Sequence, residues 1–235
     1  MPERIHLEVH VATVIAVRGT AEERIAPELG AVSLTVSASG AERDATLART
    51  STAHEQLIAE VRELEASGAL DTWSAGQLRV SSHRPWNNEG KQLPVVHQAS
   101  ADLEVVFTDL ERLGDWVSTV SLGDSVGIGG IDWRLTDASR KRTQESAQRG
   151  AVADAVAKAA VYAAALGLGS PSPVELADTG LLTAQPVPPG APAERMFAMR
   201  ASADMAGGGG GPSQFTPALL VITASVEARF AADAA

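Results

Sequence analysis

The sequence contains no cysteine and few aromatic residues. The absence of cysteine excludes disulfide bridges, thiolate metal ligands and cysteine nucleophiles. Aromatic residues make up 4% of the 235 residues and hydrophobic residues 45%, so we expect a globular core of closely packed valine, leucine, isoleucine and alanine. The chain also lacks any apolar run of about 18 residues, and therefore no transmembrane helix is predicted.

Basic residues are outnumbered, with 19 Lys and Arg against 29 Asp and Glu and a formal net charge of −10. Such an acidic protein is not expected to bind nucleic acid, whose phosphates need basic partners. The first residues, MPERIHLEVHV, do not resemble a secretion signal, which has a basic segment followed by an apolar one. We therefore expect a cytoplasmic protein from the sequence as given, and a periplasmic or secreted one if a leader was removed.

Alternating apolar and polar residues predict several β-strands. The first is expected over residues 5–19 and the second over residues 32–37, joined by GTAEERIAPELG. We predict that these two strands pair as an antiparallel hairpin. Further strands are predicted over residues 75–84, 95–107, 126–135, 173–178 and 220–230.

Apolar residues at helical spacing predict three helices. The first lies between Gly40 and Ser67 and ends at Gly68. The second is the short segment DLERLGDWVSTVSLG, with Asp109 as N-cap. The third runs from about residue 137 to 166 and carries alanines four residues apart, which would allow a close approach to a sheet. At ~1.5 Å per residue this helix is about 45 Å long.

Because helices interrupt pairs of strands, the pattern indicates an α+β fold with antiparallel or mixed sheets. The helices, including the long Ala-rich one, are expected to pack on one face of the sheets. We predict a single domain over residues 1–235 that can divide into two subdomains, about 1–107 and 108–235. The Pro- and Gly-rich segment 182–216 is predicted to be a disordered loop.

Four segments occur in an order that resembles one known family. They are VRGTAEERIAPELGAVSLTV, DLERLGDWVSTV, GIGGIDWRLTD and AVADAVAKAAVYAAALGL, followed by a Pro/Gly-rich gap and an alternating terminal strand. Over about residues 4–231 the chain resembles the SIMPL-domain family, also described as a domain of unknown function (DUF541). Family members often carry a secretion signal, which is not seen here, and Ala21 replaces a glycine of the usual opening.

The resemblance implies a bacterial protein with a two-part α+β fold that assembles into homo-oligomers. It also implies an association with stress responses. The family supplies no established catalytic residues that could be carried over to this chain.

Three motifs that resemble functional sites are better explained by ordinary structure. The sequence GDSVG matches a nucleophile elbow by letter, but a helix precedes Ser125 and a strand follows it, which is the reverse of an elbow. We interpret it as a turn. His6 and His10 would lie ~13 Å apart on a strand, too far for one metal ion. The glycine run at 207–211 lacks the Lys-Ser/Thr of a phosphate loop. We therefore predict no catalytic residue, no cofactor and no metal site.

Four residues are candidate subunit contacts. Trp86 lies in the polar loop HRPWNNEGKQLP, where an exposed ring is typical of a contact surface. The sequence MFAM is an apolar island in the segment 182–216, and it contributes Met196, Phe197 and Met199.

Two functional hypotheses follow from the sequence. The first is a non-enzymatic, self-assembling homo-oligomer whose sheet edges pair with another copy, acting as a scaffold or as a ring, cage or conduit. The alternative is a small-ligand-binding module with an apolar pocket between the long helix and the sheet.

Overall fold

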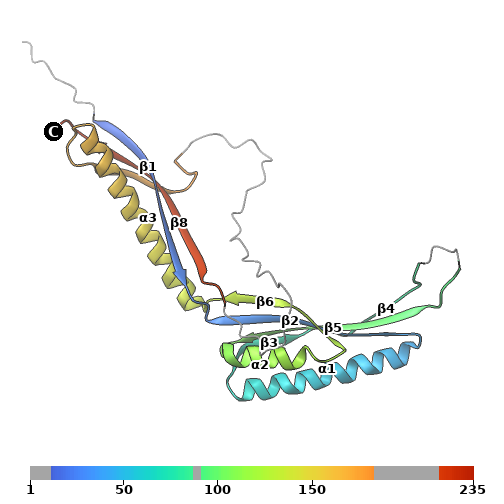
Figure 1. The fold of residues 1–235 in the computed structure, drawn as a ribbon. Helices are drawn as coiled ribbons and strands as arrows, with labels where there is room; N and C mark the ends of the chain where they lie inside the picture. The colour runs from blue at the N-terminus through green and yellow to red at the C-terminus, as the bar shows by residue number, and fades with distance from the viewer. Residues whose placement is uncertain (1–11, 87–90, 183–216) are drawn as a thin grey trace, which may run out of the picture. The chain divides into compact units, whose positions relative to one another are not determined.

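The structure is a computed structural model that describes residues 12–86, 91–182 and 217–235. These residues form three helices and eight strands, and most of them are labelled in Figure 1. In chain order they are β1 (Thr13–Ile25), β2 (Leu29–Gly40), α1 (Arg43–Ala66), β3 (Leu70–Ala75), β4 (Arg79–His83), β5 (Val96–Phe107), α2 (Leu110–Val120), β6 (Val126–Arg134), α3 (Asp137–Ala165), β7 (Ser172–Asp178) and β8 (Leu220–Ala232). The strand pairs with a resolved register are all antiparallel, so the predicted α+β fold is confirmed.

The chain divides into two compact units. Among the described residues, unit 1 comprises 12–25, 137–182 and 221–235, and unit 2 comprises 26–86, 91–136 and 217–220. The division falls after Ile25 and after Thr136, whereas the sequence suggested a boundary near residue 107. The reason is that β6 pairs with β2, which holds α2 and β6 in the same unit as the strands that precede them.

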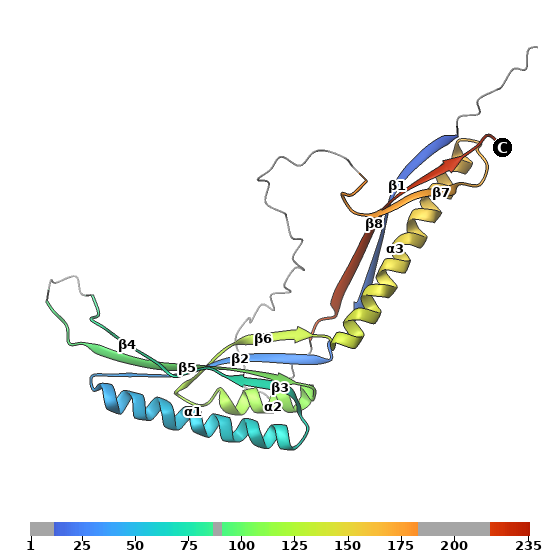
Figure 2. The ribbon, with the colours of Figure 1, turned by 180° about the vertical axis from the view of Figure 1, so that it is seen from behind.

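Unit 2 is a five-stranded sheet covered by two helices. Its strand order is β3-β5-β2-β6, and β4 pairs with β5 next to β3. Figures 1 and 2 show α1 and α2 on the same face of this sheet. The strand predicted over residues 75–84 is present as β4, in the shorter range Arg79–His83, and β3 is a further strand that the sequence did not predict; both pair with β5.

The helices bury the apolar face of this sheet. Phe107 is fully buried at the end of β5, and its ring centroid lies 5.3 Å from that of Trp116 on α2. Trp116 also donates a hydrogen bond from its indole nitrogen to Glu60 of α1, over 3.3 Å. The buried members of this core are Val32, Leu34, Val36, Leu57, Val61, Leu103, Val105, Phe107, Leu113, Trp116, Val117 and Val120.

Several local predictions in unit 2 are confirmed. Asp109 caps α2 by accepting a hydrogen bond from the backbone N–H of Arg112, over 3.1 Å. The glycines of β6 produce the expected bulge, which shifts the register with β2 between Ser33 and Leu34. Gly130 lies opposite Ser33 with φ +141°, a conformation that favours glycine.

Unit 1 is a three-stranded sheet packed against α3. The strand order is β1-β8-β7, so the predicted hairpin between the first two strands is wrong. The segment read as a connection continues β1 to Ile25, and its residues keep alternating between partly buried and exposed. The predicted strand residues 5–11 lie outside the described residues, as do residues 183–216 of the Pro/Gly-rich segment.

The alanine spacing of α3 meets the sheet as predicted. Its buried stripe packs on Ile15 and Val17 of β1 and on Val226 and Phe230 of β8. The fully buried members of the stripe are Ala147, Ala151, Ala155, Ala159 and Ala163. Short side chains on the helix let the two layers approach closely.

The approach is closest at Gly19 of β1. A Cβ atom at Gly19 would overlap the carbonyl oxygen of Ala151 and lie 2.8 Å from the Cβ of Ala155. None of the helices in the described ranges is long and apolar enough to cross a membrane.

Candidate assembly surfaces

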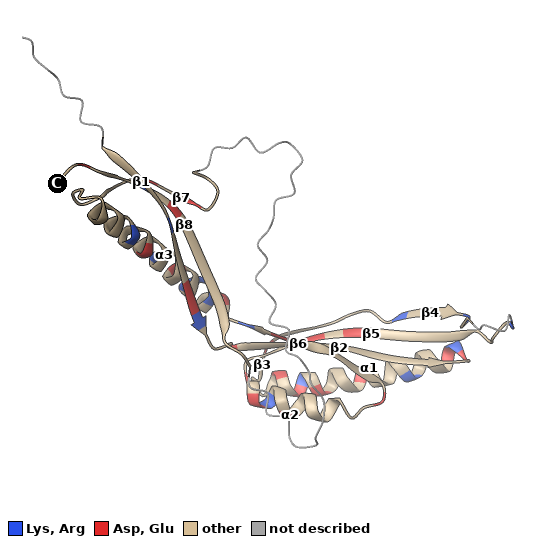
Figure 3. Cartoon of the chain, turned by 45° about the horizontal axis from the view of Figure 1, so that its top comes forward, with Lys and Arg blue, Asp and Glu red and all other residues tan. Residues whose placement is uncertain are grey.

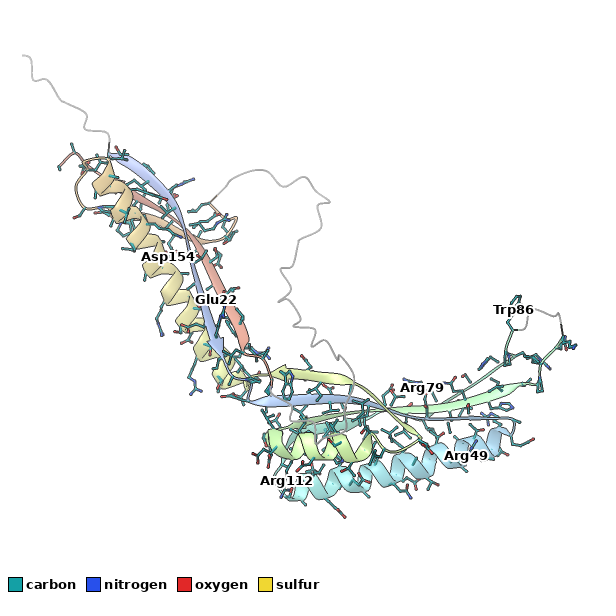
Figure 4. The ribbon with its side chains drawn as sticks, in the orientation of Figure 1. Glu22, Arg49, Arg79, Trp86, Arg112 and Asp154 are labelled. Carbon is teal, nitrogen blue, oxygen red and sulfur yellow. The ribbon has the colours of Figure 1, made fainter. Side chains whose placement is uncertain are left out.

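One edge of the unit 1 sheet is closed by side chains of α3. Asp154 accepts a hydrogen bond from the backbone N–H of Thr20 over 2.8 Å, and Lys158 donates one to the carbonyl oxygen of Arg18 over 3.0 Å. Lys158 also bonds Asp154 over 2.6 Å. Asp154 is labelled in Figure 4 on the side of α3 that meets β1. These contacts form hydrogen bonds with backbone N–H and C=O groups of β1 that could otherwise bond to a strand of another chain.

The hydrogen bond from the Lys158 ammonium, helped by the N–H of Thr20, lowers the pKa of Asp154 below its ordinary value. A carboxylate with a depressed folded-state pKa stabilises the fold above its unfolded pKa and loses that contribution as the pH falls through the folded pKa.

We expect Asp154→Ala to lower the melting temperature of unit 1 at neutral pH, because it removes this closure of β1. The difference from the natural chain should persist above pH ~4 and disappear in acid, where Asp154 is protonated in both folded and unfolded states. Circular dichroism melts from pH 7 to pH 2 check this. A difference that did not shrink toward low pH would contradict the role of the charge.

The C-terminal end of α3 is apolar on all sides. The last helical residues and Leu166, which directly follows α3, read AAVYAAAL over 159–166 and contain no charged side chain. Val161 is 64% exposed, Tyr162 51% and Leu166 65%. Figure 3 shows that the charges of α3 lie along its N-terminal and middle parts and not at this end. We call Val161, Tyr162 and Leu166 the apolar end of α3. A helix that is apolar all round is typical of a buried helix.

Strand β7 is exposed on both faces. Leu176 pairs with Ala228 of β8, so the two residues share the face that α3 covers. Ala228 is buried there, yet Leu176 is 57% exposed and its neighbour Val174 is 58% exposed. The helix therefore covers β8 and leaves β7 uncovered. Among the described residues, no side chain bonds the backbone of β7 as Asp154 and Lys158 bond that of β1.

The other face of this sheet carries ion pairs. Arg18 of β1 bonds Glu227 of β8 over 2.8 Å, and Arg229 bonds Glu175 of β7 over 2.7 Å. The hydrogen bond from Arg18 lowers the pKa of Glu227. Arg229 also donates to the carbonyl oxygen of Leu182 over 3.2 Å. As a result, the charge of the only glutamate in β7 is already paired within the same copy.

The sequence-predicted contact residues are placed only in part. Trp86 follows β4, which pairs antiparallel with β5, and its side chain is 85% exposed (Figure 4). Met196, Phe197 and Met199 lie outside the described residues. Their contact with another subunit stays a prediction.

The predicted ligand pocket would have to lie where α3 meets its sheet. At Gly19 the two layers touch, which leaves no room for a ligand at that point. An open hollow near the N-terminal end of α3 is lined by Glu23, Arg24, Ile25, Arg142, Thr143 and Ser146. Ser146 donates a hydrogen bond to Glu23 across it, over 2.9 Å. Five of the six lining residues carry polar or charged side chains, unlike the apolar pocket that the alternative hypothesis requires.

The motifs that resemble catalytic or metal sites lie either in a turn or outside the described residues. Ser125 lies in the turn between α2 and β6, as predicted, and its carbonyl oxygen accepts a hydrogen bond from the N–H of Ser37 over 2.7 Å. His6 and His10 lie outside the described residues. Within the described ranges, no group of three or more His, Asp or Glu side chains is placed to hold a metal ion.

A family model matches most of the chain. The model is SIMPL, "Protein of unknown function (DUF541)", and the match covers residues 15–230. The resemblance noted from the sequence is thereby confirmed. A comparison with curated proteins finds no match.

Proposed function

Because the chain belongs to the SIMPL family of proteins of unknown function, we propose that it is a self-assembling, non-enzymatic homo-oligomer. Copies associate through unit 1, and the assembly acts as a scaffold or as a ring, cage or conduit. A protein of this kind needs a surface that is stable only when covered by another subunit.

The observation that carries this proposal is the apolar end of α3. Its three large side chains are more than half exposed in a single copy. Large apolar surfaces on a single chain are typical of protein contact sites. Most of the strongly exposed large hydrophobic side chains also belong to unit 1: Val14, Val156, Val161, Tyr162, Leu166, Val174, Leu176, Leu181 and Val221.

Electrostatics favours contact at this end. With a formal net charge of −10, two copies repel each other over most of their surfaces. From residue 159 to residue 174 the sequence contains no charged residue. Copies can approach there without bringing like charges of this segment together, and burial of apolar side chains then supplies the attraction.

The solution mass tests the proposal. Light scattering coupled to size exclusion, at low and moderate salt, is expected to give a discrete multiple of 24.3 kDa that is stable across protein concentration. A mass of one chain under all conditions would contradict self-assembly. Trp86→Ala serves as a separate arm, since an unchanged mass would remove Trp86 from the subunit contacts.

A further inference from the structure

We propose that β7 of one copy pairs antiparallel with β7 of a second copy across a two-fold axis, joining two three-stranded sheets into one of six strands. This inference rests on the proposed function and names the element that carries it. The new interface would cover Val174 and Leu176, which α3 leaves exposed.

The two edges of the unit 1 sheet are treated differently. The β1 edge is closed by Asp154 and Lys158, which bond its backbone at Thr20 and Arg18. The β7 edge has no such closure among the described residues. Proteins block edge strands with charged side chains or covering elements when pairing is unwanted. Within the part of the chain that the structure describes, β7 is therefore the edge that is not blocked against strand pairing.

The side chains of β7 suit pairing with a second copy. Alternate residues of β7 direct their backbone N–H and C=O groups away from β8. A second antiparallel strand can form hydrogen bonds with these groups. Glu175 adds no unpaired charge, since Arg229 of the same copy binds it. A two-fold interface uses the same patch on both subunits. The backbone donors and acceptors of an edge strand match those of the same strand in a second, antiparallel copy.

The sequence of β7 favours one register. A two-fold axis perpendicular to the sheet places one residue of β7 directly opposite itself. An axis at Glu175 would set two carboxylates opposite each other, which is unfavourable. Around Val174 the ladder is irregular, with a register shift between Pro173 and Glu175. Axes at Leu176 and at Ala177 both avoid these problems. An axis at Ala177 would set Leu176 opposite Asp178, whereas an axis at Leu176 places the two leucines of the pair directly against each other and sets Val174 opposite Asp178. Contact between two apolar side chains therefore favours the axis at Leu176.

Single-cysteine variants test this register directly, because the natural chain contains no cysteine. Directly opposed residues in an antiparallel pair bring their Cβ atoms about 4.5–5.5 Å apart, close enough for a disulfide after small adjustments. We expect Leu176→Cys to form a disulfide dimer under mild oxidation in most molecules. Glu175→Cys and Ala177→Cys should cross-link at least several-fold less. Leu122→Cys, in unit 2 and 83% exposed, is the control for random collision.

The outcomes separate the two proposals. A cross-linking maximum at Leu176→Cys, with Leu122→Cys silent, supports β7 pairing. If the natural chain is oligomeric but no β7 variant cross-links above the control, β7 pairing is overturned and self-assembly stands. Equal cross-linking along β7 also overturns it, since a fixed register predicts one maximum. A monomeric natural chain overturns both. Circular dichroism of each variant confirms that α3 remains folded.

Discussion

Replacing Gly19 by alanine is expected to destabilise unit 1 by about 1–3 kcal/mol, the range typical of overpacking in a closely packed layer. The added methyl group would overlap the backbone carbonyl oxygen of Ala151 and press on the Cβ of Ala155. Backbone atoms of a regular helix cannot rotate away as a long side chain can. The strand and α3 must therefore separate, which weakens contacts along the whole alanine stripe.

The two units can be followed by different spectroscopic signals. All four tryptophans, Trp73, Trp86, Trp116 and Trp133, lie in unit 2, so tryptophan fluorescence reports on unit 2 alone. The helical circular dichroism signal reports on α3 of unit 1 together with α1 and α2 of unit 2. In Gly19→Ala, urea unfolding followed by circular dichroism should show an earlier loss of helix, with the tryptophan fluorescence transition unchanged.

Gly127→Ala is the matched control for Gly19→Ala. A Cβ at Gly127, also in a strand, would lie 3.7 Å from the carbonyl oxygen of Thr35, an ordinary contact. We expect this control to leave both transitions close to those of the natural chain. An equal loss of stability in the two variants would contradict the close packing of α3 on β1.

Replacing Phe107 by alanine is expected to destabilise unit 2 by about 3–5 kcal/mol. The ring is fully buried between the sheet and α2, and it packs on Trp116 with centroids 5.3 Å apart. Removal of the ring leaves a cavity between the sheet and α2. To close it, β5 would have to give up its register with β2, or α2 would have to give up its cap at Asp109.

Tryptophan fluorescence reports this change, since Trp116 loses its ring contact. The urea midpoint followed by fluorescence should fall, while the part of the circular dichroism signal that belongs to α3 unfolds as before. Leu122→Ala, at an exposed position just after α2, should leave the midpoint unchanged. A small effect of Phe107→Ala would mean that the unit 2 core lies elsewhere.

Local features of the fold could be predicted because they depend on neighbouring residues. Asp109 caps α2 by bonding a backbone N–H three residues away, and Gly68 and Gly167 end helices with φ values of +77° and +68°. The alanine stripe of α3 and the bulge of β6 also follow from spacing and composition within one segment. Such signals need no knowledge of distant parts of the chain.

Strand pairing could not be predicted in the same way. The first two strands are close in the sequence and appear suited to a hairpin, but β1 pairs with β8, nearly two hundred residues later. What decides the partner is the shared burial of Ile15 and Val17 with Val226 and Phe230 against α3. The alternation of apolar and polar residues shows which side chains of a strand are buried. It does not show whether they are buried in the core of unit 1 or in that of unit 2.

The candidate surfaces were visible in the sequence only in part. The absence of charge between residues 159 and 174 is visible in the sequence, where this segment predicts a helix followed by a short strand and gives no indication of a contact surface. The exposure of β7 could not be predicted from the sequence, because it depends on which strands α3 covers. The helix covers β8 and leaves Leu176 of β7 exposed. Trp86 was identified as exposed from its polar loop, and the structure places it so.

We expect copies of this chain to associate through the apolar end of α3. The most direct test compares the mass of the natural chain with that of Val161→Lys by light scattering at equal concentrations. The substitution adds a charge to an exposed side chain, so folding should be preserved. We predict a discrete multiple of 24.3 kDa for the natural chain and a smaller mass for the variant. A natural chain with the mass of one copy, or two equal multiples, would contradict the claim.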